Sequence, residues 1–402
     1  MRVRRCKVLY LEPREAVEFD LDILLAGGNG LRRERRWIAL APHLGEEMEV
    51  DAAERELLGA LSPDEWVDSG QLDVDARRVL KRLLAIGLVL AAGKGHAVQR
   101  QRDETLRSLH WHPLAATLHA FTRWRDADAV QAMQDTGTAT AVEMRQVLGP
   151  PPATTLDLAV GNRQVPLPRA CRNGFDQLLA RRATCRNFDA GRPLPIALFA
   201  QLMERVFSAQ AQVRVSDDTV FLKKTSPSGG GLHPIEAYLI VRNVEGLAPG
   251  LYHYQPITHA LVALPAPDRP LQELAMDAVA GQHWFADAPA MVVLAPRYDR
   301  SFWKYRHHAK AHRAITLEAG HLSQTLYLAA TEAGLAAYIT CAINEVPLEQ
   351  AFGLDHASSG ALAVCGFGWR GEEMLTMELD PAGEIWQQQP PAGKQHPNPA
   401  AL

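Results

Sequence analysis

The clearest alternation of apolar and polar positions lies between residues 315 and 334. Six apolar residues recur there at alternating spacings of four and three: Ile315, Ala319, Leu322, Leu326, Ala329 and Ala333. This spacing places them on one face of a helix, and Gly334 follows where a C-terminal cap is expected. The preceding residues 301–308, Ser-Phe-Trp-Lys-Tyr-Arg-His-His, bring aromatic, cationic and titratable groups to the front of the helix. We therefore expect a buried helix with chemistry near its start.

Around this helix, residues 170–375 combine predicted strands with predicted helices. A helix is predicted at 194–207, where apolar residues repeat at helical spacing. Short apolar runs predict strands at 236–241, 250–254, 260–264, 291–295, 337–342 and 361–366. Residues 256–259 are expected to join the second of these strands to the third as a hairpin. The pattern predicts an α+β domain with a mixed sheet flanked by helices.

Residues 1–100 read as a separate module. The pattern predicts strands at 8–11 and 36–40, amphipathic helices at 51–61 and 73–87, and a further apolar run at 88–90. Two helices followed by a β-wing resemble a winged-helix fold. Such a module binds peptide or DNA, or serves as a scaffold or dimerisation element. The mixed charges of the second helix argue against DNA.

Two segments of weaker pattern flank the α+β domain. Residues 101–169 are a predicted connector, in which the aromatic run from 110 is expected to pack against the second domain. Residues 135–168 are rich in Thr, Gly and Pro and predict a linker. Residues 376–402 form a C-terminal tail, and its end from 387 is predicted to be disordered.

Composition narrows the class of protein. The chain has 402 residues, of which 47% are hydrophobic and 22% charged, as in a globular protein of two or three domains. A net charge of -4 gives no general case for nucleic acid. The start lacks the pattern of a secretory signal, and the chain lacks a membrane-length apolar run, so we expect a soluble, cytoplasmic protein. Five cysteines without a Cys-x-x-Cys pair predict neither a disulfide framework nor structural zinc.

Two arginines and a threonine alternate before the helix predicted at 194–207. In an extended segment, Arg182, Thr184 and Arg186 point the same way and form a cradle for an anion such as phosphate. A basic surface before a helix is the alternative interpretation.

A glycine-rich stretch at 225–231, Thr-Ser-Pro-Ser-Gly-Gly-Gly, leads into the strand at 236–241. Its bare backbone N–H groups suit a planar ligand with hydrogen-bond acceptors around its edge. A flexible turn is the alternative. The stretch fits neither a nucleophile elbow nor a phosphate-binding loop of a nucleotide hydrolase, and the chain has no dinucleotide-binding fingerprint.

The segment before the long helix contains an adjacent Lys304 and Tyr305. An ammonium favours the phenolate form of a nearby phenol, so the two side chains are expected to act as one proton-transfer unit. His308 and His312 are spaced as in a zinc-binding helix, but they lack the glutamate of a zinc protease. We therefore predict no metal site there.

Several of these segments together resemble the SagB-type flavin dehydrogenases of the nitroreductase-like superfamily. The matching stretches are residues 181–188, 227–238, 250–256, 303–305, 318–330 and 366–368. The resemblance implies an FMN-binding α+β fold and a homodimer with the flavin at the subunit interface. It also implies a role in maturing ribosomally made peptides, where FMN oxidises azolines to azoles.

The resemblance also implies roles for individual residues. Arg182, Thr184 and Arg186 match the segment that holds the FMN phosphate and ribityl chain, and Arg370 is a further phosphate candidate. The positions beside the flavin ring are Pro227, Ser228, Gly229, Gly230, Gly334 and Leu335. Lys304 and Tyr305 match the catalytic Lys-Tyr pair. Thr184 stands where serine is usual, and the N-terminal module matches the peptide-binding regions of the family only loosely.

These features predict a two-electron oxidation of a precursor peptide, with a cyclodehydratase as a further partner. Lys304 and Tyr305 are expected to assist removal of a carbon-bound proton while a hydride passes to flavin N5. One alternative is an NAD(P)H-dependent reductase of nitro groups, quinones or activated alkenes. Another is a non-catalytic peptide-binding scaffold of a maturation complex.

Overall fold

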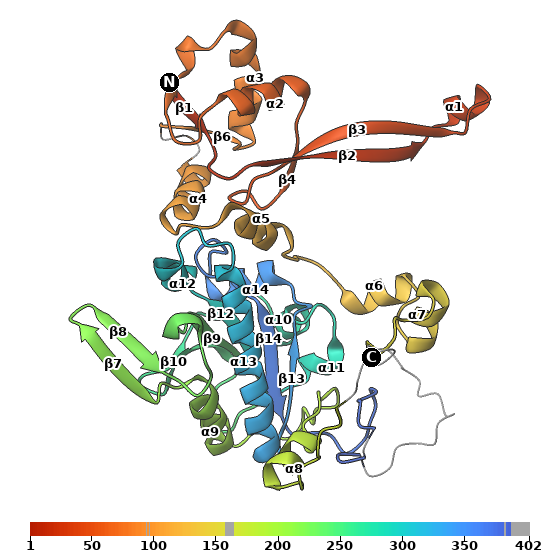
Figure 1. Ribbon diagram of the computed structural model, residues 1–402, viewed down its shortest axis with the longest axis vertical. Helices are drawn as coiled ribbons and strands as arrows, with labels where there is room; N and C mark the ends of the chain where they lie inside the picture. Colours follow the sequence, from red (N-terminus) through yellow and green to blue (C-terminus); the bar gives the residue numbers. More distant parts are fainter. Residues whose placement is uncertain (94, 96, 157–164, 382, 387–402) are drawn as a thin grey trace. The chain divides into compact units, whose positions relative to one another are not determined.

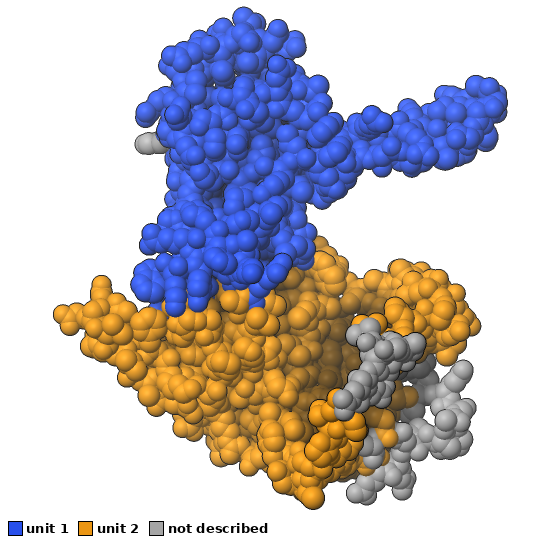
Figure 2. All heavy atoms as spheres, viewed as in Figure 1, with its two compact units in different colours: residues 1–123, 297–313, 355–359 blue, residues 124–296, 314–354, 360–402 orange. Residues whose placement is uncertain are grey.

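The chain divides into two compact units (Figure 2). The computed structural model describes all residues except 94, 96, 157–164, 382 and 387–402, so the predicted disorder from residue 387 falls outside the described residues. Unit 1 comprises residues 1–123, 297–313 and 355–359, and unit 2 comprises residues 124–296, 314–354 and 360–402. Unit 1 therefore takes in two short segments from the second half of the sequence.

Unit 2 is built on a six-stranded sheet (Figure 1). Its strands, in spatial order, are β11 (Ala260–Ala263), β10 (Gly250–Gln255), β9 (Ile235–Val241), β12 (Ala290–Pro296), β14 (Ala363–Gly368) and β13 (Ala336–Thr340). The ladders are antiparallel, and a parallel bridge from Thr184 to Ala337 extends the sheet beyond β13. Every residue of β12 is buried, as expected for a central strand covered on both faces. The predicted α+β class and the hairpin between β10 and β11 are confirmed.

Helices supply the other layers of unit 2. They are α6 (Ala129–Asp135), α7 (Ala141–Leu148), α8 (Gly174–Arg181), α9 (Ile196–Phe207), α10 (Leu271–Ala278), α11 (His283–Ala286), α13 (Ala311–Glu332, whose first turn falls in unit 1) and α14 (Glu345–Phe352). A buried cluster including Leu274, Trp284 and Tyr338 joins α10, α11 and β13 in the core. α9 confirms the helix predicted at 194–207.

The long helix α13 confirms the periodicity of its sequence. Five of the six apolar positions are buried, and Ala333 is half-buried just beyond the helix end. Gly334 adopts a φ of 72°, and the Leu335 N–H donates to the Ala330 carbonyl at 2.8 Å, which caps the helix. The residues before it form a separate short helix, α12 (Tyr298–Lys304). The helical conformation is interrupted between the two helices, where His307 adopts a left-handed φ of 52°.

Unit 1 contains a winged-helix-like part. Strands β5 (Val67–Asp68), β1 (Arg2–Arg5) and β6 (Val89–Ala91) form one sheet, beside helices α2 (Ala52–Ala60) and α3 (Val74–Ala85). Both predicted helices are confirmed, and the apolar run at 88–90 overlaps β6. β1 was not predicted, because three of its four residues are arginines and form no apolar pattern.

A long hairpin was only partly predicted from the sequence. Strands β2 (Tyr10–Phe19) and β3 (Leu31–Leu40) pair over ten residues, with α1 (Leu21–Leu25) at the tip and β4 (Glu47–Glu49) beside β3 (Figure 1). The predicted strands at 8–11 and 36–40 covered one end of it. The rest was missed because cross-strand ion pairs, such as Arg33 with Glu15 and Arg36 with Glu18, replace an apolar alternation.

Two further elements correct the sequence-based prediction. α7 lies inside the segment predicted as a linker, where the Thr140 and Glu143 side chains form a capping box that starts it. A second hairpin, β7 (Ala211–Ser216) and β8 (Thr219–Lys223), was missed because β7 is exposed at every residue and carries no half-buried pattern.

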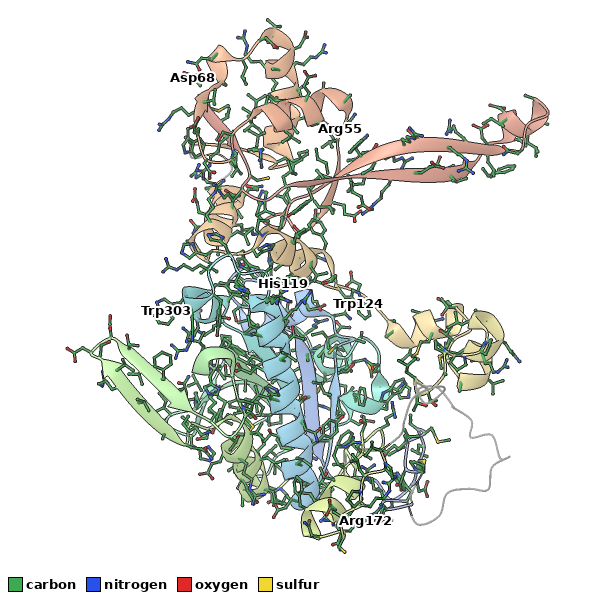
Figure 3. The ribbon with its side chains drawn as sticks, viewed as in Figure 1. Arg55, Asp68, His119, Trp124, Arg172 and Trp303 are labelled. Atoms are coloured by element: carbon green, nitrogen blue, oxygen red, sulfur yellow. The ribbon has the colours of Figure 1, made fainter. Side chains whose placement is uncertain are left out.

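The aromatic run from residue 110 packs within unit 1. Between α4 (Ala97–Ser108) and α5 (Pro113–Phe121), the Trp111 ring lies 4.5 Å from the Tyr298 ring and 4.7 Å from the Phe302 ring, measured between centroids. The Trp111 indole donates to the Ala357 carbonyl at 2.8 Å, and His119, labelled in Figure 3, stacks on Trp111. These partners lie in the range 170–375 predicted as the second domain, but they belong to unit 1, and the contacts hold α12 there.

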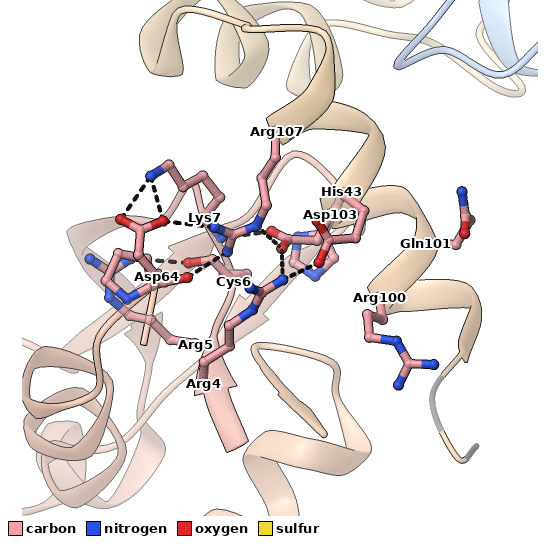
Figure 4. Close-up of polar contacts among 12 residues, drawn as sticks. Arg4, Arg5, Cys6, Lys7, His43, Asp64, Arg100, Gln101, Asp103 and Arg107 are labelled. Atoms are coloured by element: carbon pink, nitrogen blue, oxygen red, sulfur yellow. Dashed lines mark hydrogen bonds and ion pairs between the residues drawn. The ribbon is translucent and has the colours of Figure 1, made fainter. Parts of the chain in front are cut away.

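A buried ion cluster joins α4 to the first strand (Figure 4). The Asp103 carboxylate is fully buried and accepts hydrogen bonds from the Arg107 Nε and the Lys7 N–H, both at 2.6 Å. Arg4 is also buried, with its Nη2 3.8 Å from Asp103 and in an ion pair with the more exposed Glu104. Removing the buried negative charge would take away the fully buried partner that Arg4 and Arg107 share.

We expect Asp103→Asn to lower the free energy of unfolding by about 2 kcal/mol, because the charge-assisted hydrogen bonds weaken in a buried place. Glu104→Gln is the matched control, since it removes a partly exposed partner of the same Arg4 and should cost under about 1 kcal/mol. Urea denaturation followed by circular dichroism measures both. Equal effects of the two variants would contradict the assigned importance of Asp103.

No helix among the residues that the structure describes combines the length and the apolar character required to cross a membrane.

Candidate functional site

The arginine-threonine segment of unit 2 is extended, as predicted. α8 ends at Arg181, with Arg182 as its C-cap, and the Cys185 N–H donates to the Ala337 carbonyl at 2.9 Å beside the bridge from Thr184. Ala183 and Cys185 are buried, whereas Arg182, Thr184 and Arg186 are half-buried. The three polar side chains therefore share one side of the segment.

Tyr327 of α13 organises the first two of these side chains. Its hydroxyl lies 2.9 Å from the Thr184 Oγ1 and accepts from the Ile339 N–H at 3.2 Å, while the Arg182 guanidinium lies 5.4 Å from its ring centroid. Burial raises the pKa of Tyr327, so its hydroxyl keeps its proton. The phenol thus fixes Thr184 and supports Arg182 through a cation–π contact.

Arg186 carries a donor that lacks a protein acceptor. Its Nε is buried and has no hydrogen-bond partner among the described residues, while its Nη1 donates to the Met377 carbonyl at 3.3 Å. Burial lowers the pKa of Arg186, which reflects the cost of holding its charge there. Because an unpaired buried donor is unfavourable, an anion placed at this side chain would stabilise the segment. The unpaired Nε of Arg186 therefore fits the phosphate of FMN.

The glycine-rich loop is anchored on the same helix. The Pro227 carbonyl lies 3.2 Å from the His321 Nδ1, and the Ser226 and Thr325 hydroxyls are 2.8 Å apart. A Cβ added at Gly229 would lie 3.2 Å from the Ala314 Cβ, so glycine permits this close approach to α13. Gly230 adopts a φ of 66°, in the left-handed region that glycine favours.

α13 brings three predicted segments together. His321 and Tyr327, which contact the loop and the arginine segment, are six residues apart, about 9 Å along the helix axis. Gly334 and Leu335 follow the end of the helix and lead into β13, where Ala337 pairs with Thr184. Of the predicted cofactor residues, all but Arg370 thus belong to segments that contact α13 or follow its end.

Arg370 is occupied elsewhere. It forms an ion pair with the buried Glu378, which also accepts hydrogen bonds from the Arg186 and Asn187 N–H groups at 2.6 and 3.1 Å. This ion pair helps to hold residues 376–378 along the arginine segment, and the contact of Arg370 with a phosphate stays a prediction.

The predicted catalytic pair lies in unit 1, at the end of α12. The Lys304 Nζ lies 5.4 Å from the centroid of the Tyr305 ring, so the ammonium faces the aromatic ring. Tyr305 is half-buried, whereas Lys304 and the neighbouring Trp303 (Figure 3) are exposed. Their action on a flavin held by unit 2 stays a prediction.

The helical spacing of His308 and His312 is not realised in the structure. α13 begins at Ala311, so His308 lies outside the helix that contains His312. The described part of the chain has no group of three or more His, Cys, Asp or Glu side chains arranged to hold a metal ion.

Sequence reasoning missed three residues of this region: Glu318, Tyr327 and Glu378. The first two lie within the stretch at 318–330 that carried the family resemblance, which was the available signal. Glu378 binds residues about 190 positions earlier in the chain, and local patterns contain no information on such contacts.

Comparison with known proteins agrees with this geometry. The model of the nitroreductase family matches residues 179–369. The chain is 31% identical over 172 residues to the nitroreductase-like protein MJ1384 of Methanocaldococcus jannaschii, and the match covers 43% of this chain and 80% of that relative. The chain belongs to the nitroreductase family, which makes it an oxidoreductase.

Two other relatives are named for processing other molecules. The chain is 29% identical over 144 residues to the trifolitoxin-processing protein TfxB of Rhizobium leguminosarum bv. trifolii, covering 35% of this chain and 38% of TfxB. It is 27% identical over 187 residues to the microcin B17-processing protein McbC of Escherichia coli, covering 45% of this chain and 65% of McbC. The chain thus spans less than two thirds of each of these two relatives.

A solved structure shares the fold. A chain of the E. coli microcin synthetase McbBCD complex with truncated pro-MccB17 bound superimposes with a TM-score of 0.51 at 19% identity. The match covers 67% of this chain and 94% of that chain. The recognised family and its fold are therefore confirmed.

Proposed function

We propose that this protein is an FMN-dependent dehydrogenase that matures a ribosomally made peptide by oxidising azolines to azoles. The observation that carries the proposal is the buried, unpaired Nε of Arg186 in a cradle that shares α13 with the glycine-rich loop. The family, together with relatives named for processing microcin B17 and trifolitoxin, supports it.

Residues of unit 2 would hold the cofactor. Arg182, Thr184 and Arg186 would bind the phosphate and ribityl chain, because two cations and a hydroxyl lie on one side of one segment. The ring would lie against residues 227–230 and 334–335, whose backbone N–H groups suit its edge. When bound there, FMN would supply the two-electron oxidation.

Lys304 and Tyr305 would move the proton. Tyr305 would act as its phenolate, with the Lys304 ammonium as counter-ion, and would accept the carbon-bound proton next to the reacting carbon. Only a short stretch of chain separates Tyr305 from Ala314, the residue that faces Gly229. The proposal includes a homodimer, as the family resemblance implies.

The partners in this proposal are a precursor peptide and a cyclodehydratase. The McbBCD complex with pro-MccB17 bound supports both, and the winged-helix-like part of unit 1 is the peptide-binding candidate. We place the activity in the cytoplasm, where precursor peptides are made.

An NAD(P)H-dependent reductase is the second candidate function. The match to 80% of MJ1384, at the highest identity of the three relatives, favours it. It differs from the first candidate in its electron donor and needs no peptide.

Two measurements on the purified protein separate these functions. Absorbance between about 350 and 500 nm would reveal bound flavin, and mass spectrometry of a candidate peptide would reveal the loss of two hydrogens. We expect a yellow protein that oxidises the peptide. Rapid bleaching by NAD(P)H without any peptide oxidation would favour the reductase, and a colourless protein that binds peptide would favour a scaffold.

A further inference from the structure

Two histidines in left-handed backbone conformations meet in unit 1, beside the proposed catalytic pair. His307 has a φ of 52° and His110 a φ of 56°, and the His307 N–H donates to the His110 carbonyl at 2.9 Å. A positive φ is uncommon for a residue with a Cβ and persists where surrounding contacts hold it. His110 follows the end of α4, where this conformation is common. His307 is exposed, so its conformation needs another explanation.

The His307 ring makes a second contact with the same part of the chain. Its Nδ1 lies 3.3 Å from the Trp111 carbonyl, and because a carbonyl only accepts, this nitrogen carries the proton and donates. The ring also meets the His110 ring edge-on, with the two centroids 5.3 Å apart. The backbone and the side chain of His307 are thus bonded to two consecutive residues, His110 and Trp111.

Trp111 also holds the other end of the stretch that contains the catalytic pair. Its side chain is buried and packs on two aromatic rings of α12. Between these rings and His307, the Tyr305 N–H donates to the Ser301 carbonyl, and the Tyr305 carbonyl accepts from the His308 N–H, both at 3.1 Å. Trp111 therefore fixes α12 by its ring and the turn after α12 by its carbonyl, and Tyr305 lies between the two attachments.

We propose that His307 is a positioning residue for the proposed base: its left-handed turn and its bond to the Trp111 carbonyl fix the backbone that presents Tyr305. Glycine would adopt this φ more easily but could not donate to Trp111 from a side chain. This inference rests on the proposed function and names a further residue for its proton-transfer step. Such a residue matters because a misplacement of about 1 Å can slow a reaction about 100-fold.

Three variants of His307 test the inference in single-turnover oxidation of a candidate peptide with FMN bound. His307→Ala should lower the maximal rate about 10- to 100-fold at unchanged affinity for peptide and FMN, because the turn loses its bond to Trp111. His307→Gly removes the backbone strain together with the ring and should be as slow as His307→Ala. His307→Asn tolerates a positive φ and keeps a donor, so it should recover most of the rate. A wild-type rate in His307→Gly would overturn the inference, because the turn alone would then suffice.

His259→Ala is the matched control. His259 of unit 2 is also exposed, has a φ of 48° and uses its Nδ1 in a hydrogen bond with the Tyr254 hydroxyl at 2.7 Å, so this variant should keep the wild-type rate. A double-mutant cycle then separates positioning from general damage. In a Tyr305→Phe background, His307→Ala should have little further effect. A full additional loss there would show that His307 does not act through Tyr305.

A test without peptide or flavin keeps this inference apart from the proposed function. Hydrogen exchange of residues 301–308 should be about tenfold faster in His307→Ala, as the loss of one hydrogen bond predicts, and unchanged in His307→Asn and His259→Ala. Equal exchange in His307→Ala and the wild type would contradict the role of His307. If the wild type oxidises no peptide, the proposed function fails, and hydrogen exchange still decides whether His307 fixes the turn.

Discussion

Replacing Tyr305 with phenylalanine is expected to slow peptide oxidation about 10²- to 10⁴-fold while FMN stays bound, because general acid–base catalysis contributes that much. The substitution removes one hydroxyl and keeps the ring on which the Lys304 ammonium lies. The contacts that hold α12, between Trp111 and the buried Tyr298 and Phe302, also remain. The loss would therefore belong to the proton-transfer step.

Single-turnover oxidation of a candidate peptide, followed by mass spectrometry and by flavin bleaching, measures this effect. Tyr10→Phe is the matched control, since it removes the hydroxyl of another half-buried tyrosine of unit 1. The control should keep the wild-type rate. If Tyr305→Phe retained full oxidation with flavin bound, Tyr305 would not be the base, and an exposed neighbour such as His308 would need testing in its place.

The six-stranded sheet of unit 2 and its helices α9 and α13 were predictable because most of these elements bury one face or both. Sequence patterns indicate which side chains are buried. The spacing along α13 and the apolar runs of β9 and β12 contain this signal. Most of the hairpin of β2 and β3 has no such apolar pattern. Its pairing depends on oppositely charged side chains across the strands, as in Arg33 with Glu15, and these residues are equally common in loops.

The candidate site was predictable to the extent that it follows local geometry. Alternation alone placed Arg182, Thr184 and Arg186 on one side of an extended segment. The partners that decide their states come from distant positions: Tyr327 for Thr184, and Glu378 for Arg370. The sequence does not show whether an arginine has an ion-pair partner. The difference between Arg186, with an unpaired Nε, and Arg370, paired with Glu378, therefore appeared only in the structure.

Arg186→Gln is expected to lower FMN affinity about 100-fold, because truncating a buried charged donor to a phosphate costs several kcal/mol. Without FMN the same variant should be as stable as the wild type or more stable. The buried guanidinium has an unpaired Nε and a pKa lowered by burial, so the apo protein carries its desolvation cost without an anion in return.

Thermal unfolding with and without FMN tests both halves of this prediction. At a flavin concentration about 100 times the wild-type Kd, the wild type gains about 2.7 kcal/mol, and the variant should lose most of that gain. Arg181→Gln is the control: it removes an exposed arginine at the end of α8, one position before the cradle, and should leave the gain intact. Equal losses in the two variants would point to general electrostatic attraction. If Arg186→Gln destabilised the protein without FMN, the arginine would instead stabilise the fold. Contacts within the protein would then offset the desolvation free energy of its guanidinium.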